Sequence, residues 1–180
     1  SRGSAAEAIA KLKPTAWWRF DEFAGPRAED EMNRHDGIYE IQVAYQLAGP
    51  HSEKFTPGQV NRAAHFVGQR MQARLPKLGT SYTASLWFWN GMPNDSREVL
   101  GWMFSRGRNH ALNSGESLGL NAKGQLIFRS GEKTFTGKTV APRWTWHHAT
   151  LVRNSDTARI YLDGKLQIEA KITAPLPVQS

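Results

Sequence analysis

Few side chains in this sequence have the spacing that catalysis requires. Residues 115–119 read GESLG, the G-x-S-x-G pattern of serine hydrolases. That turn functions only between a strand and a helix, with an aspartate and then a histidine after it. No helical pattern follows here, and no histidine follows Asp156 or Asp163. A glycosidase needs two carboxylates that face one cleft, whereas the three acids at 29–31 are consecutive in a polar loop, which splays them apart. The sequence therefore gives no support for hydrolysis.

The histidines and the absence of cysteine limit the chemistry further. Without cysteine the chain forms no disulfide and has no thiol nucleophile, and the cellular compartment stays open. No two of the six histidines have the spacing of a helical metal site. His147 and His148 are neighbours in a predicted strand, so they point to opposite faces and cannot chelate one ion together. We expect His148, which shares a face with Trp146, to be a core histidine.

Basic residues outnumber acidic ones, which gives the chain a net charge of +7. Such a charge favours nucleic acid, anionic lipid or anionic polysaccharide as a partner, or it only keeps the protein soluble. Segment 97–138 carries +4 of this excess, and its densest cluster is RGRNH at 106–110. Arginine pairs with carboxylate or sulfate through two parallel hydrogen bonds. The basic ligand candidates are therefore Arg106, Arg108, His110 and Arg129, with a solvated basic loop as the alternative.

Seven tryptophans are a second source of ligand contacts. Large aromatic side chains fill the cores of sandwiches, and they also offer flat faces to sugar rings and bases. We expect Trp87 to pack in the core. Trp89, near the end of the same predicted strand, and Trp102, beside the basic loop, are candidate exposed platforms. The other four tryptophans are expected to be structural.

Alternating apolar and polar residues predict the strands that position these side chains. The clearest are a strand at 82–90 and a three-strand meander over 146–170, because a period of two marks a strand with one buried face. Asp163–Gly164 has the composition of a two-residue hairpin turn. A short helix is predicted only at 5–13, which with a tag remnant at 1–4 forms a linker. Roughly a dozen short strands indicate an all-β fold, a two-sheet antiparallel sandwich or jelly roll.

Several motifs lie in a fixed order along the chain. They are WWRFDE at 17–22, HDG at 35–37, AAHFVG at 63–68, YTASLWF at 82–88, WHHA at 146–149 and RIYLDG at 159–164. Together they resemble the laminin-G-like jelly-roll domains of the concanavalin A-like superfamily, over residues 14–171. The resemblance implies two curved antiparallel sheets stacked face to face. It also implies glycan binding rather than catalysis, as in most members.

The resemblance further implies a calcium site in the loop at 29–37. Many family members bind calcium there with a loop that reads Asp-Ser-Ser-Gly-Asn-Gly-x-Asp-Gly. This chain reads EDEMNRHDG, in which Met32 and Arg34 replace glycines and Arg34 adds a positive charge. The positions that fit are Asn33, Asp36 and Gly37. We therefore expect an optional Ca²⁺ site at the Glu29–Gly37 loop and no other cofactor.

These observations predict a non-catalytic carbohydrate-binding module at residues 14–180, cut from a larger extracytoplasmic protein that is secreted, periplasmic or on the cell surface. Its predicted ligand is an acidic polysaccharide, sulfated or uronic. A protein–protein or adhesion module on the same fold is one alternative, and a glycosidase or polysaccharide lyase is another. Nucleic-acid binding would rest on charge alone, without a binding motif. No apolar run approaches the roughly 18 residues of a membrane span.

Overall fold

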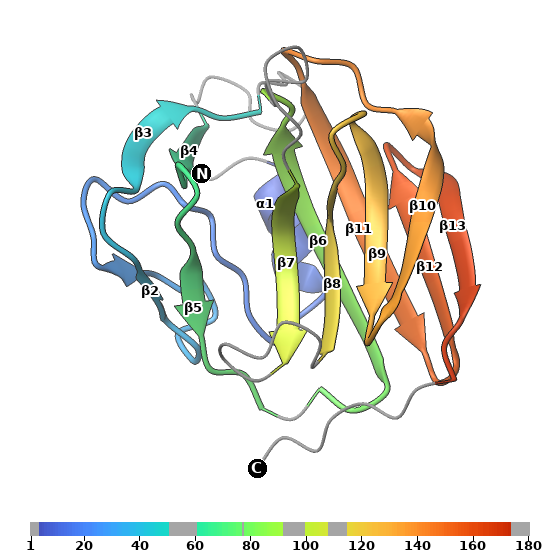
Figure 1. The fold of residues 1–180 in the computed structure, drawn as a ribbon. Coiled ribbons are helices and arrows are strands. Elements are labelled where there is room, and N and C mark those ends of the chain that lie inside the picture. Colours follow the sequence, from blue (N-terminus) through green and yellow to red (C-terminus); the bar gives the residue numbers. More distant parts are fainter. Residues whose placement is uncertain (1–3, 51–60, 77, 92–99, 108–114, 174–180) are drawn as a thin grey trace. The chain divides into compact units, whose positions relative to one another are not determined.

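The computed structural model describes residues 4–50, 61–76, 78–91, 100–107 and 115–173. The chain divides into two compact units, residues 1–76 and 77–180, and each has its own apolar core. Among the described residues there are one short helix and thirteen strands, and the strands form four antiparallel sheets (Figure 1). The predicted all-β antiparallel fold is confirmed.

The first unit holds the helix and five short strands. Helix α1 (Ser4–Lys11) lies where the sequence predicts a helix. No helix in the described part of the chain is long and apolar enough to cross a membrane. One sheet has the order β1-β2-β5, and a second sheet pairs β3 with β4. The strand bounds are Arg27–Ala28 for β1, Gly37–Tyr39 for β2, Ala44–Ala48 for β3, Arg62–His65 for β4 and Met71–Ala73 for β5.

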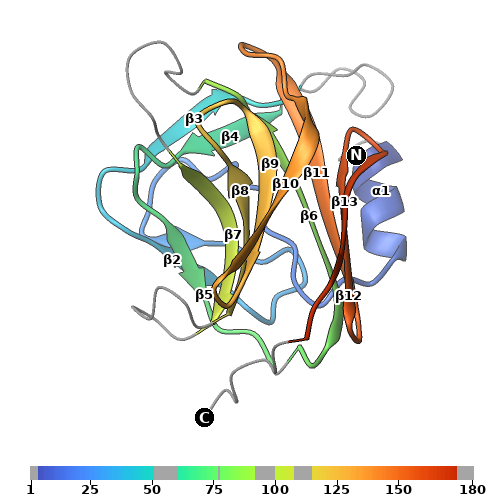
Figure 2. The same ribbon diagram turned by 45° about the vertical axis from the view of Figure 1, so that its right-hand side comes forward.

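The second unit is a two-layer sandwich. One layer has the strand order β13-β12-β11-β6 and the other has the order β10-β9-β8-β7 (Figure 2). The bounds are Ser81–Trp89 for β6, Gly101–Gly107 for β7, Gly115–Leu120 for β8, Gln125–Ser130 for β9, Lys133–Val140 for β10, Trp146–Asn154 for β11, Thr157–Leu162 for β12 and Lys165–Lys171 for β13. The predicted meander is thus β11, β12 and β13.

The local turn chemistry of the meander is as predicted. Asp163 and Gly164 join β12 to β13, and both have positive φ angles, 48° and 77°. A type I′ turn needs positive φ at both central residues, which glycine and aspartate tolerate better than β-branched residues do. The turn therefore sets the hairpin from local sequence alone.

The core of this unit lies between its two layers. Leu118 and Phe128 come from β8 and β9, Leu151 and Ile160 come from β11 and β12, and all four are fully buried in one cluster. Strands β11 and β12 bury every second residue, as expected for an antiparallel sheet with one face on a core. The side chains between these residues point outward, away from the opposite layer.

Two predicted core residues lie on the outward face instead. Trp87 is half exposed, because the core-facing residues of β6 are Leu86 and Phe88. The buried histidine is His147 rather than His148. Its two ring nitrogens lie 2.8 Å from Asp163 Oδ2 and 2.9 Å from the carbonyl oxygen of Pro142. The predicted alternation is confirmed, but the buried residues are the set opposite to the one predicted.

Candidate functional site

The outward face of β6 and β11 carries a cluster of aromatic side chains that we call the aromatic strip. The paired strands place Trp89 opposite Trp146 and Trp87 opposite His148. The ring centroids are 5.9 Å apart in the first pair and 5.1 Å apart in the second. Trp144 completes the strip. Three of its indoles remain accessible, with exposed fractions of 50% for Trp87, 48% for Trp89 and 63% for Trp144.

The backbone at one end of the strip brings Trp144 to Trp89. A β-carbon added at Gly91 would lie 3.3 Å from Cδ1 of Trp89 and 3.8 Å from Cζ3 of Trp144. Both indoles therefore lie over this glycine. Trp144 itself has a φ of 63°, and the N–H of Trp144 donates to the carbonyl oxygen of Asn90 at 2.9 Å. The loop before β11 is thereby tied to the end of β6.

Polar groups adjoin the aromatic rings on the same face. Nε2 of His148 lies 2.8 Å from Oγ of Ser85, and Thr150 pairs with Ser85 in the sheet. Burial lowers the pKa of His148, although the charge of Asp163 acts in the opposite direction. A neutral imidazole beside a hydroxyl can both donate and accept hydrogen bonds. The strip therefore combines ring stacking with uncharged hydrogen-bonding groups, which suits a polyhydroxylated ligand.

The predicted ligand residues do not form one site. Trp89 belongs to the aromatic strip, whereas Trp102 and Arg129 lie on the outward face of the other layer. This follows from their pairing with Gly119 and Ser117, which point away from the core residues Leu118 and Phe128. Since the two outward faces lie on opposite sides of the sandwich, one ligand cannot stack on both Trp89 and Trp102.

Trp102 and Arg129 are in contact with each other. The guanidinium carbon of Arg129 lies 4.6 Å from the centroid of the Trp102 ring, a cation–π distance. A β-carbon at Gly119 would lie 2.8 Å from Cε3 of Trp102, so the indole rests on this glycine. Trp102 is 38% exposed. Its ring packs on the backbone of Gly119 and on Arg129, so it positions a cation and is less exposed than Trp87, Trp89 and Trp144.

Arg106 lies in β7 rather than in an exposed loop. Its side chain is 8% exposed and lies 3.9 Å from the carboxylate of Glu116. Its guanidinium lies 4.7 Å from the ring centroid of Tyr82 and donates to the carbonyl oxygen of Gly79. These contacts leave little of Arg106 for a ligand. Arg108 and His110 lie outside the described residues.

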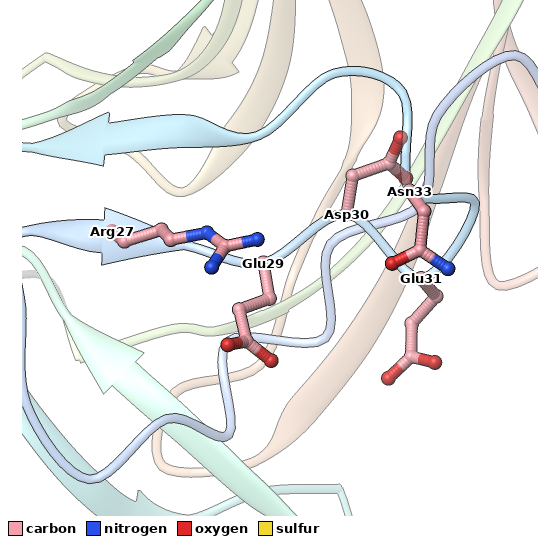
Figure 3. A pocket seen from close by; sticks show the side chains of 5 residues that line it. All are labelled: Arg27, Glu29, Asp30, Glu31 and Asn33. Atoms are coloured by element: carbon pink, nitrogen blue, oxygen red, sulfur yellow. The ribbon is translucent and has the colours of Figure 1, made fainter.

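The loop at 29–37 surrounds a small polar pocket of about 210 Å³ (Figure 3). Its lining residues are Arg27, Glu29, Asp30, Glu31 and Asn33. The carboxylate of Asp30 points away from those of Glu29 and Glu31 (Figure 3). In the described part of the chain, no group of three or more histidine, aspartate or glutamate side chains is arranged to hold a metal ion. The residues of this loop therefore do not fit the expected calcium site.

The sequence pattern missed most of the aromatic strip. The sequence predicts a core position for Trp87 and His148 and a structural role for Trp146. The alternation of β6 and β11 already placed Trp87 with Trp89 and Trp146 with His148 on common faces. The missing information was which face meets the opposite layer. For Trp144 the sequence carried no comparable signal, because its position depends on the loop over Gly91.

A family model and two solved structures are similar to this chain. No curated protein matches the chain. An S-layer domain-containing protein from Clostridium thermocellum is 20% identical, with a TM-score of 0.45 over 91% of this chain and 75% of that one. A carbohydrate-binding module, CBM66, from Bacillus subtilis is 13% identical, with a TM-score of 0.34 over 88% of this chain and 77% of that one. Residues 68–180 match a laminin-G family model described as the concanavalin A-like lectin/glucanases superfamily. The chain therefore belongs to the laminin-G-like family of the concanavalin A-like lectin/glucanase superfamily.

Proposed function

We propose that this chain is a non-catalytic carbohydrate-binding module and that the aromatic strip is its ligand surface. The observation that carries the proposal is the set of half-exposed indoles of Trp87, Trp89 and Trp144 on one outward sheet face. Membership of a lectin and glucanase superfamily supports a sugar as the ligand. We also propose that the chain is one module of a larger extracytoplasmic protein.

The mechanism of binding is ring stacking assisted by hydrogen bonds. A sugar ring has an apolar face of C–H groups, and an exposed indole offers a rigid apolar surface that loses little conformational entropy on contact. Trp87 and Trp89 are two residues apart on one strand, so their α-carbons are roughly 6.6 Å apart. Ser85 and His148 lie beside Trp87 and would bond the hydroxyl groups of the ring.

The absence of catalysis is part of the proposal. Hydrolysis or elimination needs titratable groups that converge on the reacting bond. Among the described residues of the aromatic strip, the polar side chains are Ser85, His148 and Thr150, with no carboxylate on the strip itself. The pure chain should therefore release no reducing ends or unsaturated products from any polysaccharide it binds, and such release would contradict the proposal.

Alanine substitutions in the strip test this function. Trp87→Ala and Trp89→Ala should each weaken binding to the best ligand on a glycan array about ten-fold, which corresponds to about 1.4 kcal/mol. Phe23→Ala is the matched control, because Phe23 is 88% exposed and lies in the other unit. Circular dichroism should show that all three variants are folded. Unchanged affinity in both tryptophan variants would reject the strip as the ligand surface.

A preference for acidic glycans is a second, separable part of the proposal. It is supported by the net charge of +7 and by Arg129, whose guanidinium stacks on Trp102 and could pair with a carboxylate or sulfate. The predicted ligands Arg108 and His110 remain in this proposal. Because Arg129 and the strip lie on opposite faces, the acidic group would be bound at a second surface.

Salt dependence tests the acidic preference. Exposed charge contacts weaken when the Debye length falls from roughly 14 to 4 Å, between about 0.05 and 0.5 M salt, whereas stacking changes little. Arg129→Ala should reduce affinity for a sulfated or uronic glycan at low salt and should flatten the salt dependence. Lys123→Ala removes the same charge from an exposed turn and is the control. Equal affinities for neutral and acidic glycans at low salt would reject this part alone.

The aromatic strip also favours a second function, a protein–protein or adhesion module. A contiguous apolar patch on a sheet face is a common feature of protein interfaces. If this were the function, glycan arrays would give no signal, and Trp87→Ala would instead abolish capture of a protein partner or self-association in sedimentation experiments. Glycan binding that is lost in Trp87→Ala would exclude it as the main role of the strip.

A further inference from the structure

The carboxylate of Asp30 is completely used by hydrogen bonds within the protein. Its Oδ1 accepts the N–H groups of Trp17 at 2.7 Å and Met32 at 3.1 Å. Its Oδ2 accepts the N–H groups of Arg34 at 3.1 Å and His35 at 2.9 Å. A carboxylate has about four lone-pair sites, so these four donors saturate it. Asp30 is 2% exposed, so little of its carboxylate is accessible to another ligand.

These four donors reverse the electrostatics that a cation would need. Each N–H directs its positive end at the carboxylate, as in the backbone nests that bind anions. A calcium ion at Asp30 would have to displace these protons and would leave four backbone N–H groups without acceptors, each at a cost of about 1–3 kcal/mol. Asp30 is thus an anion bound by the loop, and it is not available as a metal ligand.

Asp36, the acid of the loop that fits the family pattern, is also engaged. Its Oδ1 accepts the N–H of Asp30 at 2.9 Å. Its Oδ2 lies 2.8 Å from Nε and 2.6 Å from Nη2 of Arg27. The guanidinium of Arg27 lines the same pocket as Glu29 and Glu31 (Figure 3). A fixed cation of the protein therefore stands beside the carboxylates where the family pattern implies Ca²⁺.

Trp17 and Trp18 are hydrogen-bonded to the same loop. Trp17 donates its N–H to Asp30 and accepts the N–H of Glu31 at its carbonyl oxygen, at 2.9 Å. The indole N–H of Trp18 donates to the carbonyl oxygen of His35, also at 2.9 Å. Asp30 thus joins residues 17–18 to the whole 30–36 turn.

We propose that the conformation of the loop at 29–37 is held by hydrogen bonds to the internal Asp30 carboxylate and by the ion pair of Arg27 with Asp36, and that it is independent of calcium. This inference goes beyond the proposed function and does not depend on it, since the loop and the aromatic strip belong to different units. It predicts that the unfolding temperature of the intact chain is the same in millimolar CaCl₂ and in EGTA. MgCl₂ at equal ionic strength controls for the general effect of divalent salt.

A near-isosteric substitution tests the role of Asp30. In Asp30→Asn one oxygen becomes an NH₂ group, so two of the four N–H donors lose their acceptor. The unfolding temperature should fall by several degrees, equally with and without calcium. Glu29→Gln removes one charge from the same pocket without touching Asp30 and should leave it unchanged. An increase in the wild-type unfolding temperature that calcium causes and magnesium does not would overturn the proposal.

Amide hydrogen exchange keeps the proposal testable if Asp30→Asn fails to fold. In the wild-type chain, the N–H groups of Arg34 and His35 should exchange slowly and at the same rate in EGTA and in calcium, because their acceptor is Asp30 in both. Titration calorimetry with CaCl₂ should show no one-to-one binding. Protection of these amides only in calcium, or a one-to-one calcium isotherm that Asp30→Asn abolishes, would show that the loop needs the ion.

Discussion

Removal of the Glu116 carboxylate should strongly destabilise the sandwich. Glu116 is fully buried between the two layers. It accepts Nε of Arg153 at 2.6 Å and the hydroxyl of Tyr82 at 2.7 Å, and it lies 3.9 Å from Nη1 of Arg106. Tyr82 and Arg153 are neighbours across β6 and β11, whereas Arg106 and Glu116 are neighbours across β7 and β8. One carboxylate therefore connects both layers.

The magnitude follows from what Glu116→Ala would leave behind. The side chains of Arg153 and Arg106 are 2% and 8% exposed. Both guanidinium groups would therefore lose the carboxylate that they share, in a region with little access to water. Removing one partner of a buried ion pair lowers the free energy of unfolding by about 3–5 kcal/mol. For a chain of this size, that loss corresponds to a decrease of roughly 6–20 °C in unfolding temperature. Glu116→Gln keeps an acceptor oxygen and should cost less.

Chemical denaturation followed by tryptophan fluorescence gives the free energy of unfolding. Glu132→Ala, in an exposed turn, is the control and should change it by less than about 0.5 kcal/mol. The double variant Glu116→Leu with Arg153→Met replaces the pair by apolar side chains and should recover much of the lost stability. A loss below about 1 kcal/mol in Glu116→Ala would refute the reasoning, because it would mean that water already solvates the cluster.

Other predictions concern pH and backbone packing. Burial lowers the pKa of His148, although the charge of Asp163 acts in the opposite direction. As the pH drops, the histidine is therefore protonated first in the unfolded chain, near pH 6.5, and the free energy of unfolding should fall below that pH. Urea titrations should show this decrease in the wild-type chain and not in His148→Gln. Burial and the hydrogen bond to Glu116 raise the pKa of Tyr82. As the pH rises, the tyrosine therefore ionises first in the unfolded chain, and the free energy of unfolding should fall above about pH 10. Tyr82→Phe should reduce this pH dependence. Gly119→Ala would place a β-carbon 2.8 Å from Cε3 of Trp102, and calorimetry should therefore show a lower unfolding temperature.

Local sequence determined the meander of this protein and its hairpin turn. The alternation in residues 146–170 predicts the meander because a period of two depends only on the geometry of an extended backbone. The turn at Asp163–Gly164 is likewise local, since positive φ is a property of individual residues. The order of motifs was enough to indicate the family, because each motif marks a strand or turn of the same fold.

Tertiary structure decided which face of each strand is buried. Alternation divides β6 into two sets of residues, but both sets contain large aromatic side chains, so hydrophobicity could not choose between Trp87 and Phe88. The position of the opposite layer made that choice, and with it placed His147 inside and His148 outside. The same choice buried Arg106 beside Glu116, which no count of basic residues could anticipate.

The candidate site is a product of pairing between distant segments. Trp89 and Trp146 meet only because β6 and β11 adopt one particular register. A shift of one residue would turn every outward side chain inward. Trp102 and Trp89 illustrate the converse, since both were predicted as platforms and the layered fold puts them on opposite faces. Sequence supplied the chemical types, aromatic and basic, and the arrangement of strands in space decided which of them can share a ligand.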